Sequence, residues 1–499
     1  MKAEISAECA FPNGGAVDLE SVPTLPISAL ASAATQARDQ KKGLIALLPI
    51  RAGAERRLLL ILSDPSTGRL SASSFSLDAA EGWPSITTSW SAAHLFEREV
   101  FESSGLRPIG HPWLKAVRRH RELEANSDAP PHPFLRAEGE GVHEVAVGPI
   151  HAGIIEPGHF RLQCFGEEVL HLEIQLGYQH RAAEHLLETG TPARRIAVAE
   201  SIAGDTAIGH VLAYCTALEG LTGTKVPLRA QAIRGVALEL ERLANHVGDL
   251  GALCNDVGFL PGAAYFGRMR GDFLNLLLEI SGNRFGRSLI VPGGVRFDIP
   301  PGMQARLLET LDAVEPRLAD MAKLVFTTPS VLSRFEGTGI VESTAAVEFG
   351  FVGPTARACG VPRDVRCDHP SGVFQFSHIP VAVAEGGDVM ARATVRWLEV
   401  LRSLRFVREQ LISLPAGALR KELSALRPSA LTVALVEGWR GAIAHVVMTG
   451  ESGAVARHQV IDPSFHNWFA VALAVRRAQV SDFPLCNKSF NLSYAGHDL

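Results

Sequence analysis

The segment AESIAGDTAIGHVLAY, residues 199–214, decides how the rest of the chain is interpreted. Its first half is rich in small residues and predicts a turn, and from Ile208 onward apolar residues recur at helical spacing. Asp205 or Thr206 is suited to cap that helix, because short polar side chains accept hydrogen bonds from the free N–H groups of a first turn. A single histidine, His210, lies near the start of the expected helix.

Composition and charge describe a large globular protein. The 499 residues are too many for one ordinary domain and allow two or three, and 46% hydrophobic against 20% charged residues indicates a sizeable core. The net charge of −5 provides no basic excess for binding nucleic acid. The seven cysteines form no C-x-x-C pair, so they are interpreted as reduced core thiols of a cytoplasmic protein.

The sequence also predicts that the chain does not cross a membrane. Its first residues, MKAEISAECAFPNGG, lack the charged start and apolar run of a signal peptide. The longest apolar runs, such as 44–50 and 58–62, fall far short of the roughly 18 residues that a membrane span requires. We therefore expect any membrane association to depend on partner proteins.

The order of predicted elements indicates an α+β protein with two domains and a linker. Residues 1–120 are expected to form a small α/β domain, in which a helical pattern near 26–37 precedes three β-like runs. Residues 121–143 are polar and rich in proline and glycine, which is typical of a linker. Residues 144–499 are expected to form a large, mostly helical domain with small β-sheets near its start and end.

Long helices dominate the expected second domain. In the segment 227–250 apolar residues recur with the helical period, and Pro227 suits the start of a helix. Further helical patterns cover 256–289, 301–323 and 388–410. Apolar, β-like runs occur at 43–51 and 56–63 in the first domain and are followed by a third β-like run at 70–77. In the second domain residues 160–172 alternate as strands do, and residues 431–450 are β-like.

Two short blocks of the first domain resemble the signature of the C-type subunit of respiratory complex I. They are EREVFESSGL at 97–106 and GHPWL at 110–114, and their separation also fits that family. In that family the signature docks the domain beside the D-type subunit. The resemblance therefore implies a first domain that packs against the second.

The second domain resembles the large subunit of group 4 membrane-bound [NiFe]-hydrogenases and the related D-type subunit of complex I. Three blocks carry this resemblance: GPIHAGIIEPGHFR at 148–161, GYQHRAAE at 177–184 and RAQAIRGVALELERLANHVGDLG at 229–251. The loop at 148–161 is longer than in complex I and is similar to the hydrogenase branch. The whole chain is thus similar to a fused C- and D-type subunit.

The metal-binding cysteines of the hydrogenases are missing. Counting back without gaps from 212–214 places the two cysteines of the C-G-I-C motif on Ala203 and Thr206, and its histidine on His210. The tail resembles a D-P-C-x-x-C-T ending, with its cysteines on Ser493 and Gly496. A nickel–iron centre of this kind needs four thiolates, so we predict that the chain binds no nickel and is not a hydrogenase by itself.

The resemblance implies that polar residues surround the vacated metal cavity. The residues expected to act chemically are His151, Glu156, His210, Arg357 and Asp364, and those expected to contact a quinone are His159, Asp205 and Arg366. The tyrosine and histidine that hold the quinone in complex I fall on Gly204 and near Pro157 here. An ordinary alternative is that Arg357 pairs with Asp205 or Asp364 and closes the site.

The resemblance implies a core subunit of a membrane-associated, complex I-like oxidoreductase, similar to NADH:quinone oxidoreductase. The subunit would bind no cofactor itself, apart from quinone as a candidate ligand. It would pass electrons from a small iron–sulfur subunit resembling the complex I B-type subunit, beside ion-translocating membrane subunits. We expect it on the cytoplasmic side of the membrane, held there peripherally.

Two other interpretations stay open. In the first, the domain is a non-catalytic scaffold of such a complex. The chain retains polar residues around the vacated hole, which argues against a scaffold because unpaired buried charges are costly. These residues are His151, Glu156, His210, Arg357 and Asp364. In the second, the chain is a soluble enzyme unrelated to energy conversion, and the resemblance along the whole chain argues against that.

Overall fold

A five-stranded sheet dominates the N-terminal part of the chain. A computed structural model describes residues 8–52, 55–77, 82–118, 133–151 and 155–499. Strands β1 (Cys9–Pro12), β6 (Arg69–Leu77), β5 (Glu55–Asp64) and β4 (Gly43–Ala52) are antiparallel in that order, and β3 (Thr24–Pro26) pairs in parallel with β6. Helix α1 (Leu30–Asp39) precedes β4, and α2 (His94–Ser104) packs on it. The expected helix and the three β-like runs of this region are confirmed.

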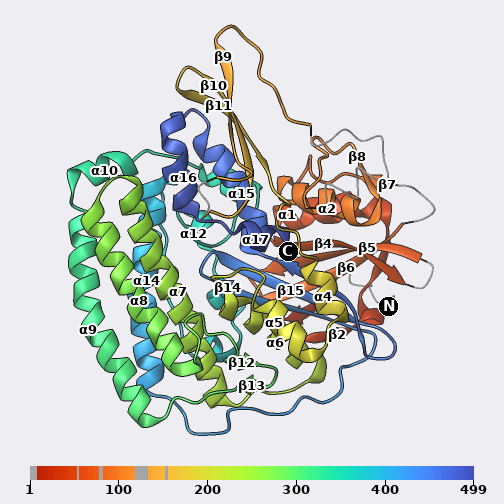
Figure 1. Cartoon of the computed structure of the whole chain (residues 1–499). Coiled ribbons are helices and arrows are strands. Elements are labelled where there is room, and N and C mark those ends of the chain that lie inside the picture. The colour runs from red at the N-terminus through yellow and green to blue at the C-terminus, as the bar shows by residue number, and fades with distance from the viewer. Residues whose placement is uncertain (1–7, 53–54, 78–81, 119–132, 152–154) are drawn as a thin grey trace.

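The two ends of the chain meet in a second sheet. Strands β16 (Val455–Ile461), β15 (Gly441–Thr449) and β14 (Ala430–Gly438) are joined by the short N-terminal strand β2 (Ala16–Asp18). Leucines of β4 and β5 share one hydrophobic core with Val433 and Val446 of this sheet. The described residues between 8 and 118 therefore do not pack as an isolated unit, but share their core with the C-terminal sheet (Figure 1).

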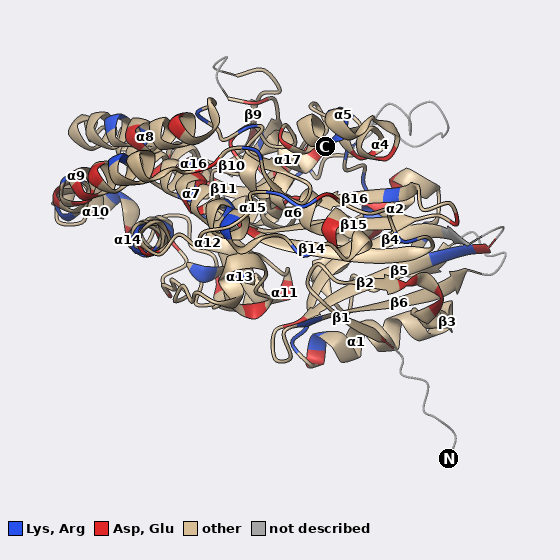
Figure 2. Ribbon diagram, turned by 90° about the horizontal axis from the view of Figure 1, so that it is seen from below, with Lys and Arg blue, Asp and Glu red and all other residues tan. Residues whose placement is uncertain are grey.

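Four long helices form the other side of the molecule (Figure 1). They are α7 (Leu228–Asp256), α8 (Leu260–Ser281), α9 (Pro301–Val325) and α14 (Val389–Ile412). Acidic and basic residues are intermixed along the outer helices α8 and α9 (Figure 2). Helix α7 is different, because the residues that it buries include charged ones, among them Glu239, Glu241 and Arg242. The mostly helical second domain predicted from the sequence is confirmed.

The remaining elements are short. A three-stranded sheet of β9 (Val142–Val147), β10 (His159–Phe165) and β11 (Glu168–Gln175) projects from the body (Figure 1). The others are η1 (Leu19–Ser21), η2 (Ile27–Ala29), β7 (Gly82–Pro84), η3 (Ser91–Ala93), β8 (Arg107–Ile109), α4 (Ala183–Thr189), α5 (Pro192–Ala199), α6 (Ala207–Thr222), β12 (Ile290–Val291), β13 (Gly294–Val295), α10 (Pro329–Phe335), α11 (Ser343–Glu348), α12 (Gly353–Arg357), α13 (Val365–Asp368), η4 (Gly372–Gln375), α15 (Pro463–Val475), η5 (Val480–Asp482), α16 (Phe483–Phe490) and α17 (Tyr494–Asp498).

Helix α6 begins where the sequence predicted but is capped differently. Thr206 occupies the N-cap position and makes no capping bond through its side chain. The carboxylate of Glu241, on α7, accepts hydrogen bonds from the N–H groups of Ile208 and Gly209 at 2.7 and 3.1 Å. A buried carboxylate from another helix therefore satisfies the free N–H groups that a capping side chain would usually bind. This arrangement fixes α6, which packs on β14 and β15, against α7.

Candidate functional site

The four positions that the resemblance matches to metal-binding cysteines lie in two turns and are themselves buried. Ala203 and Thr206 form the turn before α6, and the N–H of Thr206 donates to the carbonyl of Ala203. Ser493 caps α17, and its hydroxyl accepts a hydrogen bond from the N–H of Gly496 at 2.8 Å. The space beside these turns is filled by side chains from the C-terminal sheet region.

The first of these side chains is Arg440, at the turn between β14 and β15. Its guanidinium binds both carboxylate oxygens of Asp205, at 2.6 and 2.8 Å. It also donates to the hydroxyl of Thr206 at 3.2 Å, and it lies over the ring of Trp439. A bidentate, charge-assisted pair therefore stands at the turn where the first two thiolates would be.

The second side chain is Asp462, which follows β16 and caps α15. One carboxylate oxygen accepts a hydrogen bond from Nε2 of His210 at 2.9 Å, and the other accepts the N–H of Ser464 at 2.7 Å. A Cβ atom placed on Gly496 would lie 2.6 Å from this carboxylate, closer than non-bonded atoms approach. Gly496 is thus required by the position of Asp462, and a cysteine there would displace it.

The pKa values of both aspartates at this site are lowered. Burial acts to raise the pKa of Asp205, but the Arg440 guanidinium outweighs it and the pKa is lowered. Burial likewise acts to raise the pKa of Asp462, and the hydrogen bond from His210 together with the nearby charges lowers it. Both carboxylates are therefore ionised at neutral pH.

The opening loop contributes one of its three expected residues. Glu156 accepts hydrogen bonds from the N–H groups of Tyr494 and Ala495 in the tail, and burial raises its pKa. His151 packs near Phe160, and Nδ1 of His159 lies 3.2 Å from the carbonyl oxygen of Gly148. The structure thus brings Glu156, Asp205 and His210 to the site, whereas His151 and His159 lie at the base of the loop.

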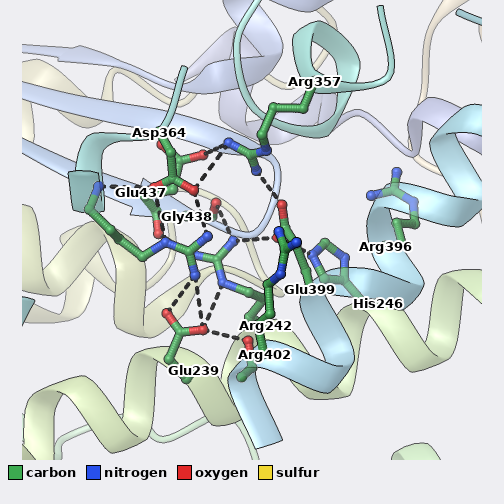
Figure 3. A network of polar contacts seen from close by, with 12 residues as sticks. Glu239, Arg242, His246, Arg357, Asp364, Arg396, Glu399, Arg402, Glu437 and Gly438 are labelled. Atoms are coloured by element: carbon green, nitrogen blue, oxygen red, sulfur yellow. Dashed lines mark hydrogen bonds and ion pairs between the residues drawn. The ribbon is translucent and has the colours of Figure 1, made fainter. Parts of the chain in front are cut away.

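The three residues expected from the loop at 353–366 lie in a separate, buried ion cluster. Figure 3 shows Arg357 and Asp364 within it. Arg357 pairs with Glu399 at 2.5 Å, Glu437 at 2.7 Å and Asp364 at 3.5 Å. Arg366 pairs with Asp364 at 2.6 Å and Glu239 at 3.1 Å. This geometry corresponds to the ion-pair alternative for Arg357 with Asp364, because the partners of its guanidinium are protein carboxylates and the backbone carbonyl of Arg363 at 2.9 Å.

The ion cluster contains one more acid than bases. Its carboxyl groups are Glu239, Asp364, Glu399 and Glu437, and its guanidinium groups are Arg242, Arg357 and Arg366. Burial raises the pKa of Glu437 to about 7, with a further contribution from the Asp364 charge. Burial also acts to raise the pKa of Glu399, but Arg357 and the hydrogen bond from His246 lower it strongly. Protonation of Glu437 would leave three carboxylates opposite three guanidinium groups, so the charges of the buried cluster would balance.

One edge of the ion cluster reaches a cavity of about 690 Å³. Arg366 and Glu437 form part of its wall, and the apolar residues Leu238, Val373 and Phe374 form another part. Of the residues expected at a quinone cavity, Arg366 is therefore the one that lines a cavity of this size. The volume lies in the range of small-molecule sites.

Arg440 and Asp462 lie outside the motifs that suggested the site, and Glu241 lies inside the block at 229–251 but was not expected to act there. Asp462 has a local signal, because an aspartate before Pro463 and an apolar run is typical of a helix start. Arg440 lies at the tight turn of an apolar hairpin, where an isolated charge is a weak signal. Glu241 has no signal, because its role depends on the packing of α7 against α6.

The donor groups at this site do not fit a nickel–iron centre. The four positions offer one hydroxyl from Thr206, one from Ser493 and no thiolate, and Asp462 blocks a side chain at position 496. Within the described ranges, no group of three or more histidine, cysteine, aspartate or glutamate side chains is arranged to hold a metal ion. No chemistry is therefore assigned to nickel in this chain.

With the fold and the geometry of the site described, comparisons with known proteins show the family to which the chain belongs. Residues 29–136 match the family described as respiratory-chain NADH dehydrogenase, 30 Kd subunit, and residues 256–429 match the 49 Kd subunit family. Formate hydrogenlyase subunit 5 of Escherichia coli is 30% identical over 436 residues, which cover 83% of this chain and 77% of that protein. The chain therefore belongs to the family of these NADH dehydrogenase subunits and the hydrogenase components related to them.

Other relatives agree with this assignment. Carbon monoxide-induced hydrogenase of Rhodospirillum rubrum is 31% identical over 70% of this chain and 97% of its own length. The C/D subunit of NADH-quinone oxidoreductase from Gluconacetobacter diazotrophicus is 27% identical over 80% of this chain and 76% of its own. In a solved structure of the membrane-bound sulfane sulfur reductase, an archaeal respiratory membrane complex, one chain superposes with a TM-score of 0.68 at 25% identity, over 73% of this chain and all of that one.

The comparisons support a fused arrangement and assign the chain to a class of core subunits. The chain is a core subunit of the kind found in complex I-like and membrane-bound hydrogenase complexes, with its 30 Kd-like part preceding its 49 Kd-like part. Both segments with lost cysteines, 199–214 and 489–499, lie outside the two matched ranges. Within the described residues, no helix is long and apolar enough to span a bilayer.

Proposed function

We propose that this chain is a metal-free core subunit of a membrane-associated, complex I-like oxidoreductase. Electrons would pass from a small iron–sulfur partner subunit towards a quinone, and charge changes at the Asp205–Arg440 site would be coupled to ion translocation by membrane subunits. The complex would lie at the cytoplasmic face of the membrane, with this chain held peripherally. The names of the relatives support the membrane complex, and the site supports the metal-free chemistry.

One observation carries this proposal. The place of the thiolates is filled by Asp205, Arg440, Asp462 and His210, which are charged or titratable groups in direct contact. A purely structural core would be more stable with well-packed apolar residues at such positions, because burying ion pairs costs desolvation energy. A redox site has a use for such groups, since they stabilise charge that appears when a bound group is reduced.

Substitution of Asp205 by Asn tests the proposal. The change keeps the size of the side chain and removes its charge, so the Arg440 guanidinium loses its bidentate partner. The purified complex containing Asp205→Asn should assemble normally and transfer electrons to a quinone at least about tenfold more slowly, equivalent to about 1.4 kcal/mol of activation free energy.

A matched control distinguishes chemistry from scaffolding. Asp298 pairs with Arg229 elsewhere, and its side chain is 41% exposed against 33% for Asp205. Asp298→Asn should leave both assembly and electron transfer unchanged. If Asp205→Asn keeps full activity, or loses activity only because the complex no longer assembles, the scaffold interpretation replaces the proposal.

A further inference from the structure

Three buried histidines and one aspartate form a continuous hydrogen-bonded chain behind the candidate site. Nε2 of His210 lies 2.9 Å from Asp462, and its Nδ1 lies 3.3 Å from Nε2 of His445. Nδ1 of His445 lies 2.9 Å from Nε2 of His458. None of the three imidazoles is more than 1% exposed.

Two elements hold these rings in line. His210 and Tyr214 are one turn apart on the same face of α6, which packs on β15. His445 on β15 lies diagonally across from His458 on β16, because its direct partner in the register is Val460. Tyr214 stacks on His458 with an angle of 11° between the rings. The chain of rings is therefore fixed by a helix face and two adjacent strands.

The hydrogen bonds fix the tautomer of every ring. Asp462 is an acceptor, so His210 donates from Nε2 and its Nδ1 is the acceptor for His445. His445 then donates from Nε2 and accepts the Nε2 proton of His458 at Nδ1. Burial lowers the pKa of His445 strongly and that of His458 to about 3, so both rings are neutral near pH 7. Neutral imidazoles have one donor and one acceptor each, as this pattern requires.

The outer end of the chain lies at the edge of the C-terminal sheet. The backbone N–H of His458 donates to Glu188 on α4, and that of Val460 donates to Glu184. Arg457 pairs with both glutamates and is about one-third exposed. The polar cluster of Glu184, Glu188 and Arg457 thus lies against the backbone of the strand that carries His458, the outermost ring, and is itself partly exposed.

We infer that Asp462, His210, His445 and His458 form a proton relay between the candidate site and the polar cluster on the α4–β16 edge. This inference rests on the proposed function for the event that the relay serves. A proton taken up at Nδ1 of His458 releases its Nε2 proton to Nδ1 of His445. His445 passes its Nε2 proton to Nδ1 of His210, which passes its own to the Asp462 carboxylate.

The relay is balanced in atoms and charge. One proton enters at His458 and one arrives at Asp462, and each ring changes from the Nε2–H to the Nδ1–H tautomer. Return of the proton along the same hydrogen bonds, from Asp462 to His458, restores the starting tautomers. Asp462 would accept the proton when negative charge appears in the site beside Arg440, because its pKa is otherwise lowered. The relay therefore supplies protons when the site is reduced.

Hydrogen exchange of the His210 ring tests the relay without any activity. In the full chain labelled with ¹⁵N in its histidine rings, all three relay rings should give the Nε2–H signature by NMR. The Nε2 proton of His210 should exchange with solvent at least about tenfold more slowly in His445→Gln, because an amide cannot pass a proton by changing tautomer. His458→Gln, which cuts the relay at its outer ring, should have the same effect if His445→Gln fails to fold.

His171→Gln is the matched control, since His171 also lies beside a carboxylate, that of Glu173, but outside the relay. It should leave the exchange of the His210 proton unchanged. An Nδ1–H signature on any relay ring, or unchanged exchange in both cut variants, would overturn the relay. A failure of the proposed function can be told apart from a failure of the relay. If the complex transfers no electrons to a quinone, the proposed function fails, but the NMR results expected for the relay do not change.

Discussion

Glu241 shows how strongly the fold acts on a single carboxyl group. Two N–H groups at the start of α6 bind it and favour its ionised form, as does the positive end of a helix. Burial is the larger influence and, with the nearby Asp205 charge, raises the pKa of Glu241 to about 8. The side chain that orders the first turn of α6, next to His210, therefore titrates in the physiological range.

The titration of Glu241 predicts a pH-dependent stability. Its pKa in the folded chain, about 8, lies above the usual 4.5, so folding binds a proton between these values. The contribution to stability is present in full below pH 4.5 and is lost as the pH rises through about 8. In Glu241→Gln the free energy of unfolding should fall less steeply with pH in this window, by about 1 kcal/mol per pH unit.

Urea denaturation midpoints at several pH values inside that window would measure the difference. Glu309→Gln, an exposed substitution on α9, should follow the wild-type slope. Equal slopes for the wild-type chain and Glu241→Gln would show that Glu241 is ionised in the folded state throughout the window.

At the scale of elements, what could be predicted from the sequence depends on how far apart the contacting residues are. Helix α7 and strands β14 and β15 were predicted correctly, because their burial patterns are local. The site could be predicted only in part. Glu156, Asp205 and His210 lie in recognisable motifs, whereas their neighbourhood is completed by residues more than 230 positions away in the chain. Such contacts leave no periodic signal, so Arg440 and Asp462 appear only in the folded molecule.

The contacts of Arg357 also could not be predicted from local sequence patterns, and they lead to a prediction about stability. Removing this side chain leaves Glu399, Glu437 and Asp364 buried without their shared partner. Arg357→Ala should therefore lower the free energy of unfolding by about 3–5 kcal/mol, the usual cost of an uncompensated buried charge. Thermal or urea denaturation of the purified chain would measure it.

An exposed ion pair on α14 provides the control for Arg357. Arg405 pairs with Glu409 one turn away, and both side chains are mostly exposed. Arg405→Ala should cost less than about 1 kcal/mol. An Arg357→Ala chain of normal stability that has lost quinone-linked electron transfer would instead assign Arg357 to the chemistry.

At the scale of the whole molecule, the chain presents one exposed apolar surface that we expect a partner subunit to cover. Its N-terminal sheet and C-terminal sheet share one core, and that core includes Val365 of the 49 Kd-like range, so the 30 Kd-like and 49 Kd-like parts are packed together. The loop that begins at residue 148 is different, because it exposes large apolar side chains. Ile150 is 89% exposed and Ile155 is 42% exposed, next to Glu156, which reaches the site. Because exposed apolar patches mark interaction surfaces, we propose that this loop, which touches the candidate site, is where the iron–sulfur partner of the proposed function docks.

Substitution of Ile150 tests that docking. A glutamate at this position would place a charge against the partner and oppose burial of the loop, so Ile150→Glu should reduce co-purification of the iron–sulfur subunit at least about tenfold, equivalent to about 1.4 kcal/mol. Leu260→Glu, at the exposed start of α8, should not, although Leu260 is 65% exposed. The wild-type complex should contain iron and acid-labile sulfide, which belong to the partner, and no nickel. About one nickel per chain would contradict the metal-free site, whereas an intact Ile150→Glu complex would move the partner to another face.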